Sequence, residues 1–171
     1  LDEDSVRLAI NKLVVEGVEA VAVCLLHSYL NPEHERRVGE MVREYMPDTF
    51  LSLSIDILPE VREYERTSTT VINSYVGPII ERYLRSLDER LMKSGVKAPL
   101  RVMQSNGGVM SARRARVAPA HMVESGPAAG VIAAQRLAER LAIGNLITFD
   151  MGGTTAKASV IEDGLPGRTT E

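Results

Sequence analysis

The chain has 171 residues, 44% of them hydrophobic and 25% charged, which is typical of about one globular domain or slightly more. A net charge of −3 with both signs interspersed offers no basic surface to nucleic acid, and the sequence lacks the long apolar run that would predict a membrane span. The single cysteine, Cys24, excludes an internal disulfide. Together with the lack of a signal-peptide pattern, this predicts a cytoplasmic protein. Because the first residues also lack an initiator methionine, we expect a piece of a longer protein.

An amphipathic helix and a buried strand are predicted at the start of the chain. Val6, Ile10 and Leu13 recur at helical spacing after an acidic first turn, and Gly17 provides a stop signal. The continuous apolar run at 20–26 is typical of a strand that is covered on both faces, as in a parallel sheet.

A β-α-β unit follows from the next two segments. Asn31 is a candidate N-cap and Pro32 suits the first position of a helix that stops near Pro47, and the apolar segment at 49–55 predicts a second strand. This alternation predicts an α/β fold built from mixed sheets flanked by helices.

A charge-dense run then precedes a long helical stretch. Such a run is most often a solvated or ion-paired face, and participation in an active site is the less common alternative; its charged residues are Arg62, Glu63, Glu65 and Arg66. The helical pattern at 70–95 contains Gly77-Pro78 near its start, which predicts a kink or a break. We place a domain junction near this helix.

A second α/β unit begins with a strand at 99–105, followed by an Asn-Gly-Gly turn, a polar and basic stretch, and a helix at 127–142. Gln104, Ser105 and Asn106 lie at the end of the strand, where open α/β sheets bind ligands, but Asn-Gly is also a strong turn signal. Both interpretations stay open.

The segment NLITFDMGGTTAKASVIEDG predicts a hairpin with an unusual turn. Glycines at 152 and 153 let a phosphate approach the backbone amides, and Thr154 and Thr155 add hydroxyl donors. Asp150 would repel such an anion unless a cation lay between them, which favours Mg²⁺ held through water. The alternative is an ordinary hairpin without a ligand.

Four blocks in this order resemble the hydantoinase A / 5-oxoprolinase family, which includes N-methylhydantoinases and ATP-dependent acetone-type carboxylases. The blocks are DILPEVREYERTSTTVINSYVGP, RVMQSNGGVMS, SGPAAGVIAA and FDMGGTTAKASVIEDG, and together they span nearly the whole chain.

The resemblance implies ribonuclease-H-like lobes of the actin-like ATPase type, only partly present here. Residues 1–65 would end the first lobe, 66–95 would form connecting helices, and 96–171 would start the second lobe with its phosphate hairpin. The implied cofactors are ATP and Mg²⁺. The implied substrate is a small cyclic amide, opened with ATP hydrolysis, and the implied partner is a second enzyme subunit or another copy of the chain. Ketone carboxylation and a non-catalytic nucleotide-binding or scaffold role are the alternatives.

Three further residues are candidate nucleotide ligands beside the hairpin. Many relatives carry an aspartate where this chain has Lys157, which either contacts phosphate or is a solvated lysine. Ser125 is a candidate N-cap, and with Gly126 it opens a helix whose amides would face an anion or whose small residues simply pack on the sheet. The catalytic residues are not predicted, and the dispersed histidines predict no zinc site.

Overall fold

The structure is a computed structural model that describes residues 1–167, so the last four residues of the predicted second lobe lie outside the described residues. Its helices are α1 (Glu3–Glu16), α2 (Glu33–Tyr45), α3 (Ser54–Ile57), α4 (Glu63–Lys93), α5 (Ala112–Val117), the 3-10 helix η1 (Pro119–Met122) and α6 (Ser125–Leu141). Its strands are β1 (Ala20–Val23), β2 (Phe50–Leu53), β3 (Arg101–Met103), β4 (Val109–Ser111), β5 (Leu146–Met151), β6 (Ala156–Glu162) and β7 (Leu165–Pro166).

Two compact units divide the chain. The first unit comprises Leu1–Pro99 with Ala112–Ala120, and the second comprises Leu100–Ser111 with the residues from His121 onward. Within residues 1–167, no helix combines the length and the apolar character needed to cross a membrane.

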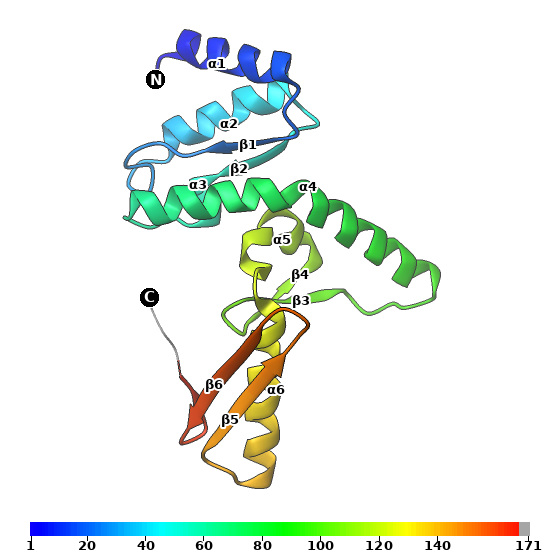
Figure 1. The fold of residues 1–171 in the computed structure, drawn as a ribbon. Helices are drawn as coiled ribbons and strands as arrows, with labels where there is room; N and C mark the ends of the chain where they lie inside the picture. Colours follow the sequence, from blue (N-terminus) through cyan, green and yellow to red (C-terminus); the bar gives the residue numbers. More distant parts are fainter. Residues whose placement is uncertain (168–171) are drawn as a thin grey trace. The chain divides into compact units, whose positions relative to one another are not determined.

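The first unit is the predicted β-α-β arrangement. β1 and β2 pair in parallel, from Ala20 opposite Phe50 to Val23 opposite Leu53. α1 and α2 lie on one side of this sheet and α4 on the other (Figure 1). A hydrophobic core fills the space between the sheet and the first two helices; its buried members are Ile10, Val21, Val23, Met41, Val42, Met46 and Leu53. The α/β fold class is therefore confirmed.

The helix ends follow the sequence signals with small shifts. The Asp2 side chain caps α1 by accepting bonds from the amides of Asp4 and Ser5, at 3.1 and 3.2 Å. α2 begins one residue later than predicted, with Pro32 at the cap position, while the Asn31 side chain accepts a bond from the Glu33 amide at 3.0 Å.

Both strands of the first unit are shorter than predicted. β1 ends at Val23 and β2 at Leu53, and α3 follows β2 directly. The Ser54 hydroxyl donates to Glu35 Oε1 at 2.9 Å, and the Ile55 amide donates to the same oxygen at 3.0 Å. These bonds to a helix 20 residues earlier in the chain replace the ladder bonds that a longer strand would make.

α4 is one 31-residue helix that begins at Glu63, earlier than the predicted 70, and continues through Pro78. Figure 1 shows that the helix changes direction near its middle, where Pro78 lies in its sequence, so a kink and not a break occurs there. Gly77 is buried against the ring of Phe50, because a helix residue without a β-carbon lets α4 approach β2 closely.

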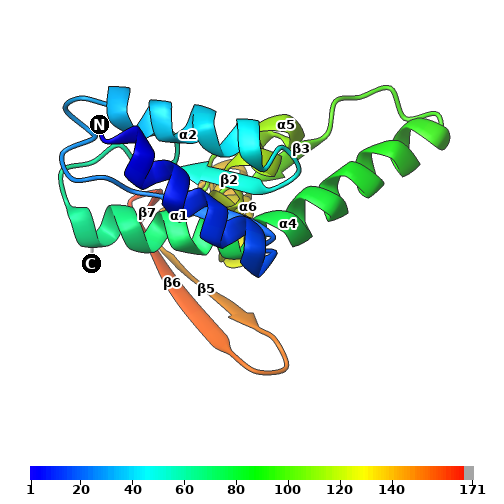
Figure 2. The ribbon, with the colours of Figure 1, turned by 90° about the horizontal axis from the view of Figure 1, so that it is seen from above.

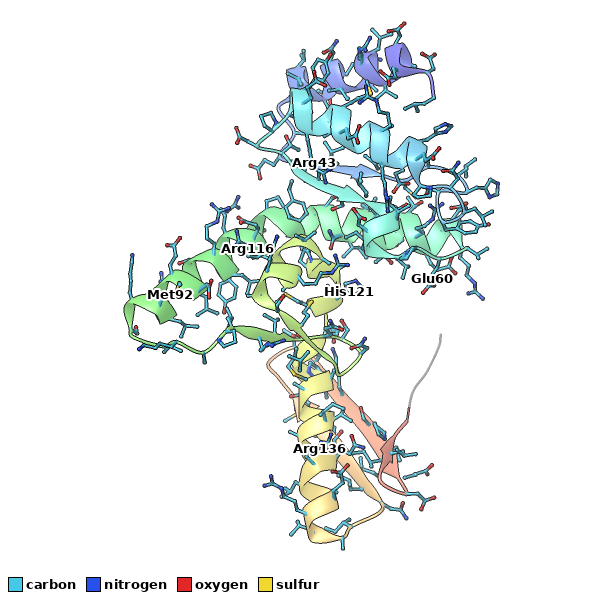
Figure 3. All side chains as sticks on the ribbon, turned by 180° about the vertical axis from the view of Figure 1, so that it is seen from behind. Arg43, Glu60, Met92, Arg116, His121 and Arg136 are labelled. Atoms are coloured by element: carbon cyan, nitrogen blue, oxygen red, sulfur yellow. The ribbon has the colours of Figure 1, made fainter. Side chains whose placement is uncertain are left out.

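The basic stretch after the Asn-Gly-Gly turn forms β4, α5 and η1, elements that the sequence pattern did not predict. Arg116 of α5 reaches Glu81 of α4 and donates to its Oε1 at 2.7 Å (Figure 3). Burial raises the pKa of Glu81, but hydrogen bonds from Arg85 and Arg116 more than offset this and hold the pKa below its ordinary value. An ionised Glu81 therefore ties α5 to α4.

The second unit consists of the β3–β4 pair, the three-stranded antiparallel sheet β5-β6-β7, and α6. α6 lies alongside the β5–β6 hairpin and contacts β5, β6 and β7 (Figure 1). One face of the hairpin is therefore covered by this helix.

Candidate functional site

The hairpin predicted at 145–164 forms. β5 and β6 pair antiparallel from Leu146 opposite Ile161 to Met151 opposite Ala156, and Figure 2 shows them as one long hairpin. Residues 152–155 form the connecting turn, in which the Gly152 amide donates to the Thr155 carbonyl at 2.9 Å. The four predicted turn residues Gly152, Gly153, Thr154 and Thr155 are all exposed.

The two faces of the hairpin differ in chemistry. Asp150 and Lys157 are directly opposite each other in the ladder, so their side chains lie on the same face. Lys157 forms an ion pair with Glu124, the residue before α6, which identifies this as the face that α6 covers. On the outer face, Ile147, Phe149 and Met151 are 72%, 67% and 71% exposed.

A groove with a volume of about 460 Å³ runs between α6 and this face of the hairpin. It brings together three of the predicted site residues, Gly126, Asp150 and Lys157. The turn residues and Ser125 do not line the groove, although the turn directly follows Asp150 and Met151. The backbone of α6 is accessible along the groove, because a β-carbon added at Gly126 or Gly130 would meet no other atom within 4 Å.

Ser125 is not the N-cap of α6, contrary to the sequence prediction. It is the first residue of the helix, and the cap position belongs to Glu124, whose φ of 64° is left-handed. The Glu124 side chain makes no capping bond to the first amides of the helix. The left-handed residue directs the chain into the helix one position earlier than a serine cap would, and the Glu124 side chain leaves the first amides of the helix uncapped.

The turn glycines have no structural reason to be glycine. The φ angles of Gly152 and Gly153 are not positive. Among the described residues, the glycines with positive φ are Gly17, Gly95, Gly107 and Gly164. A β-carbon at Gly153 would meet nothing within 4 Å, and one at Gly152 would meet only the Thr155 carbonyl at 3.9 Å. The missing side chains keep the outside of the turn open.

No three histidine, cysteine, aspartate or glutamate side chains within residues 1–167 form a group that could hold a metal ion by themselves. Asp150 alone fits Mg²⁺ only as a partial ligand, since this ion is commonly held by one or two carboxylates together with water and substrate phosphates.

The Asn-Gly-Gly turn is held by its own bonds. Gln104 donates from its backbone amide to the Gly108 carbonyl at 2.8 Å, and the Gly108 amide donates to Asn106 Oδ1 at 2.8 Å. Ser105 and Asn106 also line a second cavity of about 360 Å³ against α6 and Ser159. The structural interpretation of this turn is confirmed, and its ligand-binding interpretation stays a prediction.

Sequence reasoning missed a buried charge network in the first unit. Arg66, expected on a solvated or ion-paired face, is 0% exposed; it pairs with Glu63 and donates to the Leu25 carbonyl at 2.8 Å and to Ser54 Oγ at 3.1 Å. Glu35, also 0% exposed, accepts from the Leu25 amide at 2.9 Å. The available signal was the position of Glu35 on the same helical face as Val38 and Val42, which marks it as an inward residue.

Comparison with known proteins places this geometry in a family. The family profile Hydantoinase/oxoprolinase matches residues 66–171, and the profile Hydantoinase/oxoprolinase N-terminal region matches residues 1–46. The chain belongs to the hydantoinase/oxoprolinase family.

Relatives within the hydantoinase/oxoprolinase family are much longer than this chain. The alpha chain of caprolactamase from Pseudomonas jessenii is 38% identical over 164 residues, which cover 96% of this chain and 24% of that protein. A nucleotide-free structure of acetone carboxylase, from work on ATP-dependent acetone carboxylation, has a TM-score of 0.85 at 34% identity. The match covers 96% of this chain and 23% of the acetone carboxylase chain. The structure of the ATP-dependent caprolactamase from P. jessenii has a TM-score of 0.78 at 35% identity. The match covers 94% of this chain and 23% of the caprolactamase chain. The chain thus spans about a quarter of the length of these relatives.

Proposed function

We propose that the chain is the part of an ATP-dependent, hydantoinase/oxoprolinase-type enzyme that carries one of two phosphate hairpins. The observation that supports this most is the β5–β6 turn: its glycines are required neither by backbone angle nor by packing, and a carboxylate lies at its entrance. ATP would transfer its γ-phosphate to the carbonyl oxygen of a cyclic amide and release ADP, which makes the carbonyl carbon more electrophilic. Water would add to that carbon and the ring nitrogen would leave with a proton, giving an acyl phosphate that a second water molecule hydrolyses to the open carboxylate and free phosphate.

Each predicted residue has a role in this proposal. The Gly153 amide and the hydroxyls of Thr154 and Thr155 donate to phosphate oxygens, while Gly152 closes the turn through its bond to Thr155. The start of α6, at Ser125 and Gly126, provides further amides for an anion; Lys157 contributes a positive charge on the same side of the sheet.

Asp150 is the proposed ligand of Mg²⁺, which when bound would neutralise charge that develops on the phosphates. The Asp150 carboxylate would hold water molecules of the ion and so fix its position beside the turn. In this proposal the phosphate oxygens of the bound nucleotide would supply further ligands to the ion.

A ketone carboxylase subunit is the second candidate, since the acetone carboxylase structure has a higher TM-score than the caprolactamase structure. The hairpin residues serve either reaction, because both use the phosphates of ATP. We also propose a partner subunit, because the caprolactamase and acetone carboxylase relatives are named as subunits. The division of the chain at 1–65, 66–95 and 96–171 is part of the same proposal, as are substrate-contacting residues.

Replacing Asp150 by Asn in the complete polypeptide tests the metal role. Asparagine keeps the size and a hydrogen-bond acceptor, so we expect an unchanged thermal melt, together with ATP turnover that falls by about tenfold or more and needs more Mg²⁺. Asp88→Asn, in the second half of α4, is the matched control and should leave both unchanged. Parental turnover of Asp150→Asn at the parental magnesium requirement would show that the proposed metal role is wrong.

A further inference from the structure

Glu124 directly precedes α6 and pairs with Lys157, which lines the groove, so it joins α6 to the hairpin. Its carboxylate forms the ion pair with Lys157, and its side chain is 62% exposed. The backbone of Glu124 has a φ of 64°, a left-handed conformation that residues other than Gly, Asn and Asp adopt rarely. The chain therefore keeps a glutamate at a position whose backbone would be better suited to glycine or asparagine.

Stabilisation of the helix does not account for this glutamate. Its side chain makes no capping hydrogen bond to α6. An exposed ion pair between a lysine and a glutamate contributes little to folding stability. The main effect of Glu124 is therefore on the net charge of the groove and not on folding stability.

Three charged side chains meet at this end of the groove. Lys157 lies opposite Asp150 in the β5–β6 ladder and is paired with Glu124. Asp150 and Lys157 alone would cancel each other, whereas the addition of Glu124 leaves one net negative charge. A phosphate chain that approaches the turn therefore meets repulsion unless it brings a cation.

We propose that Glu124 makes the hairpin selective for the magnesium complex of a nucleoside triphosphate over the metal-free anion. This inference rests on the proposed function, in which the hairpin holds nucleotide phosphates. The dication in the complex cancels two of the phosphate charges, so the extra carboxylate opposes the metal-free anion more strongly than it opposes the complex. Glu124 is thus a specificity-determining residue that acts through the charge it adds beside Lys157.

The test measures ATP binding by calorimetry to the complete polypeptide, once with excess Mg²⁺ and once with a chelator in place of the metal. In Glu124→Gln we expect metal-free ATP to bind at least about fivefold more tightly, and Mg-ATP to gain only about the square root of that factor, or roughly twofold. Glu162→Gln is the matched control, because it removes the same charge from an exposed residue at the opposite end of β6. The control should leave the ratio of the two affinities at its parental value.

A second variant separates charge from folding. Glu124→Asn also removes the charge, and asparagine tolerates left-handed φ, so it should reproduce the shift in the affinity ratio while preserving the thermal melt. An unchanged ratio in both Glu124 variants, with Mg-ATP still bound, overturns the role of Glu124 and leaves the proposed function standing. A parent that binds neither form of ATP overturns the proposed function, and this inference with it.

Discussion

A substitution of Gly153 is expected to weaken ligand binding without affecting folding. Its φ is not positive and a β-carbon there meets nothing, so Gly153→Val should change the free energy of unfolding by less than about 0.5 kcal/mol. The branched side chain would nevertheless occupy the open side of the turn, and we expect Mg-ATP affinity of the complete polypeptide to fall by about tenfold or more. Urea unfolding and calorimetry measure the two effects.

Gly164→Val is the contrasting control for this prediction. The φ of Gly164 is 77°, so a β-branched residue there should cost about 1–3 kcal/mol of stability. If Gly153→Val destabilised the protein as much as Gly164→Val, or bound Mg-ATP like the parent, the open turn would have no ligand-binding significance.

Loss of the buried Arg66 side chain should strongly destabilise the first unit. Arg66→Met would leave Glu63 without its buried cation and the Leu25 carbonyl without its donor. Breaking such a buried network costs about 3–5 kcal/mol, measurable as a lower urea midpoint at constant slope. Arg62→Met is the matched control, because Arg62 is 77% exposed and pairs with Glu65 one turn away, so its loss should cost under about 0.5 kcal/mol. Similar midpoints for the two variants would contradict the assigned role of Arg66.

The burial of Arg66 could not be predicted from its neighbours in sequence. Its charge-dense surroundings resemble any exposed helix face, and its partners Leu25, Ser28 and Ser54 come from segments 12 to 41 residues away. The hairpin residues were predictable for the opposite reason: the strand, turn and returning strand are contiguous, so local alternation and glycine placement determine them.

At the scale of elements, the contact between α4 and β2 depends on Gly77. Alanine favours helices over glycine by roughly 0.5–1 kcal/mol, but the β-carbon of Gly77→Ala would overlap the ring of Phe50. Because α4 and β2 cannot separate without losing buried contacts, we expect a net loss of about 1–3 kcal/mol. Thermal or urea unfolding measures it, and the double variant Gly77→Ala/Phe50→Leu should recover much of the loss.

Gly130→Ala provides the opposite case on another helix. A β-carbon at Gly130 of α6 meets nothing within 4 Å, so the same substitution there should stabilise the protein by up to about 1 kcal/mol. Equal gains in stability at both positions would show that helix propensity, and not the Phe50 contact, governs α4.

Element boundaries were predictable only where local signals decide them. Gly17 ends α1 as predicted, because capping acts between neighbouring residues, whereas the Asp2 cap was not predicted. The end of β2 and the start of α4 were predicted wrongly, since β2 ends where Ser54 bonds to Glu35 and α4 starts where Glu63 pairs with Arg66 and accepts from the His27 amide. These contacts join segments that only the folded chain brings together.

At the scale of the whole molecule, the 171-residue chain alone should bind ATP weakly or not at all. The resemblance implies a nucleotide held between two lobes, and the chain spans about a quarter of the length of its relatives. Calorimetry with Mg-ATP on the isolated chain checks this expectation. Sub-micromolar affinity would contradict it and would indicate that the hairpin and α6 form a sufficient site by themselves or in a dimer.

The register between β5 and β6 determines which face each residue of β6 occupies. Opposed residues of an antiparallel pair share a face, so Asp150 and Lys157 both lie on the groove side because the register pairs them. If β6 slipped by one residue along β5, Lys157 would move to the apolar side with Phe149, and Ala156 or Ala158 would take its place on the groove side. A slip by two residues would return Lys157 to the groove side, whereas a slip by one inverts β6 and removes the cation from its carboxylates.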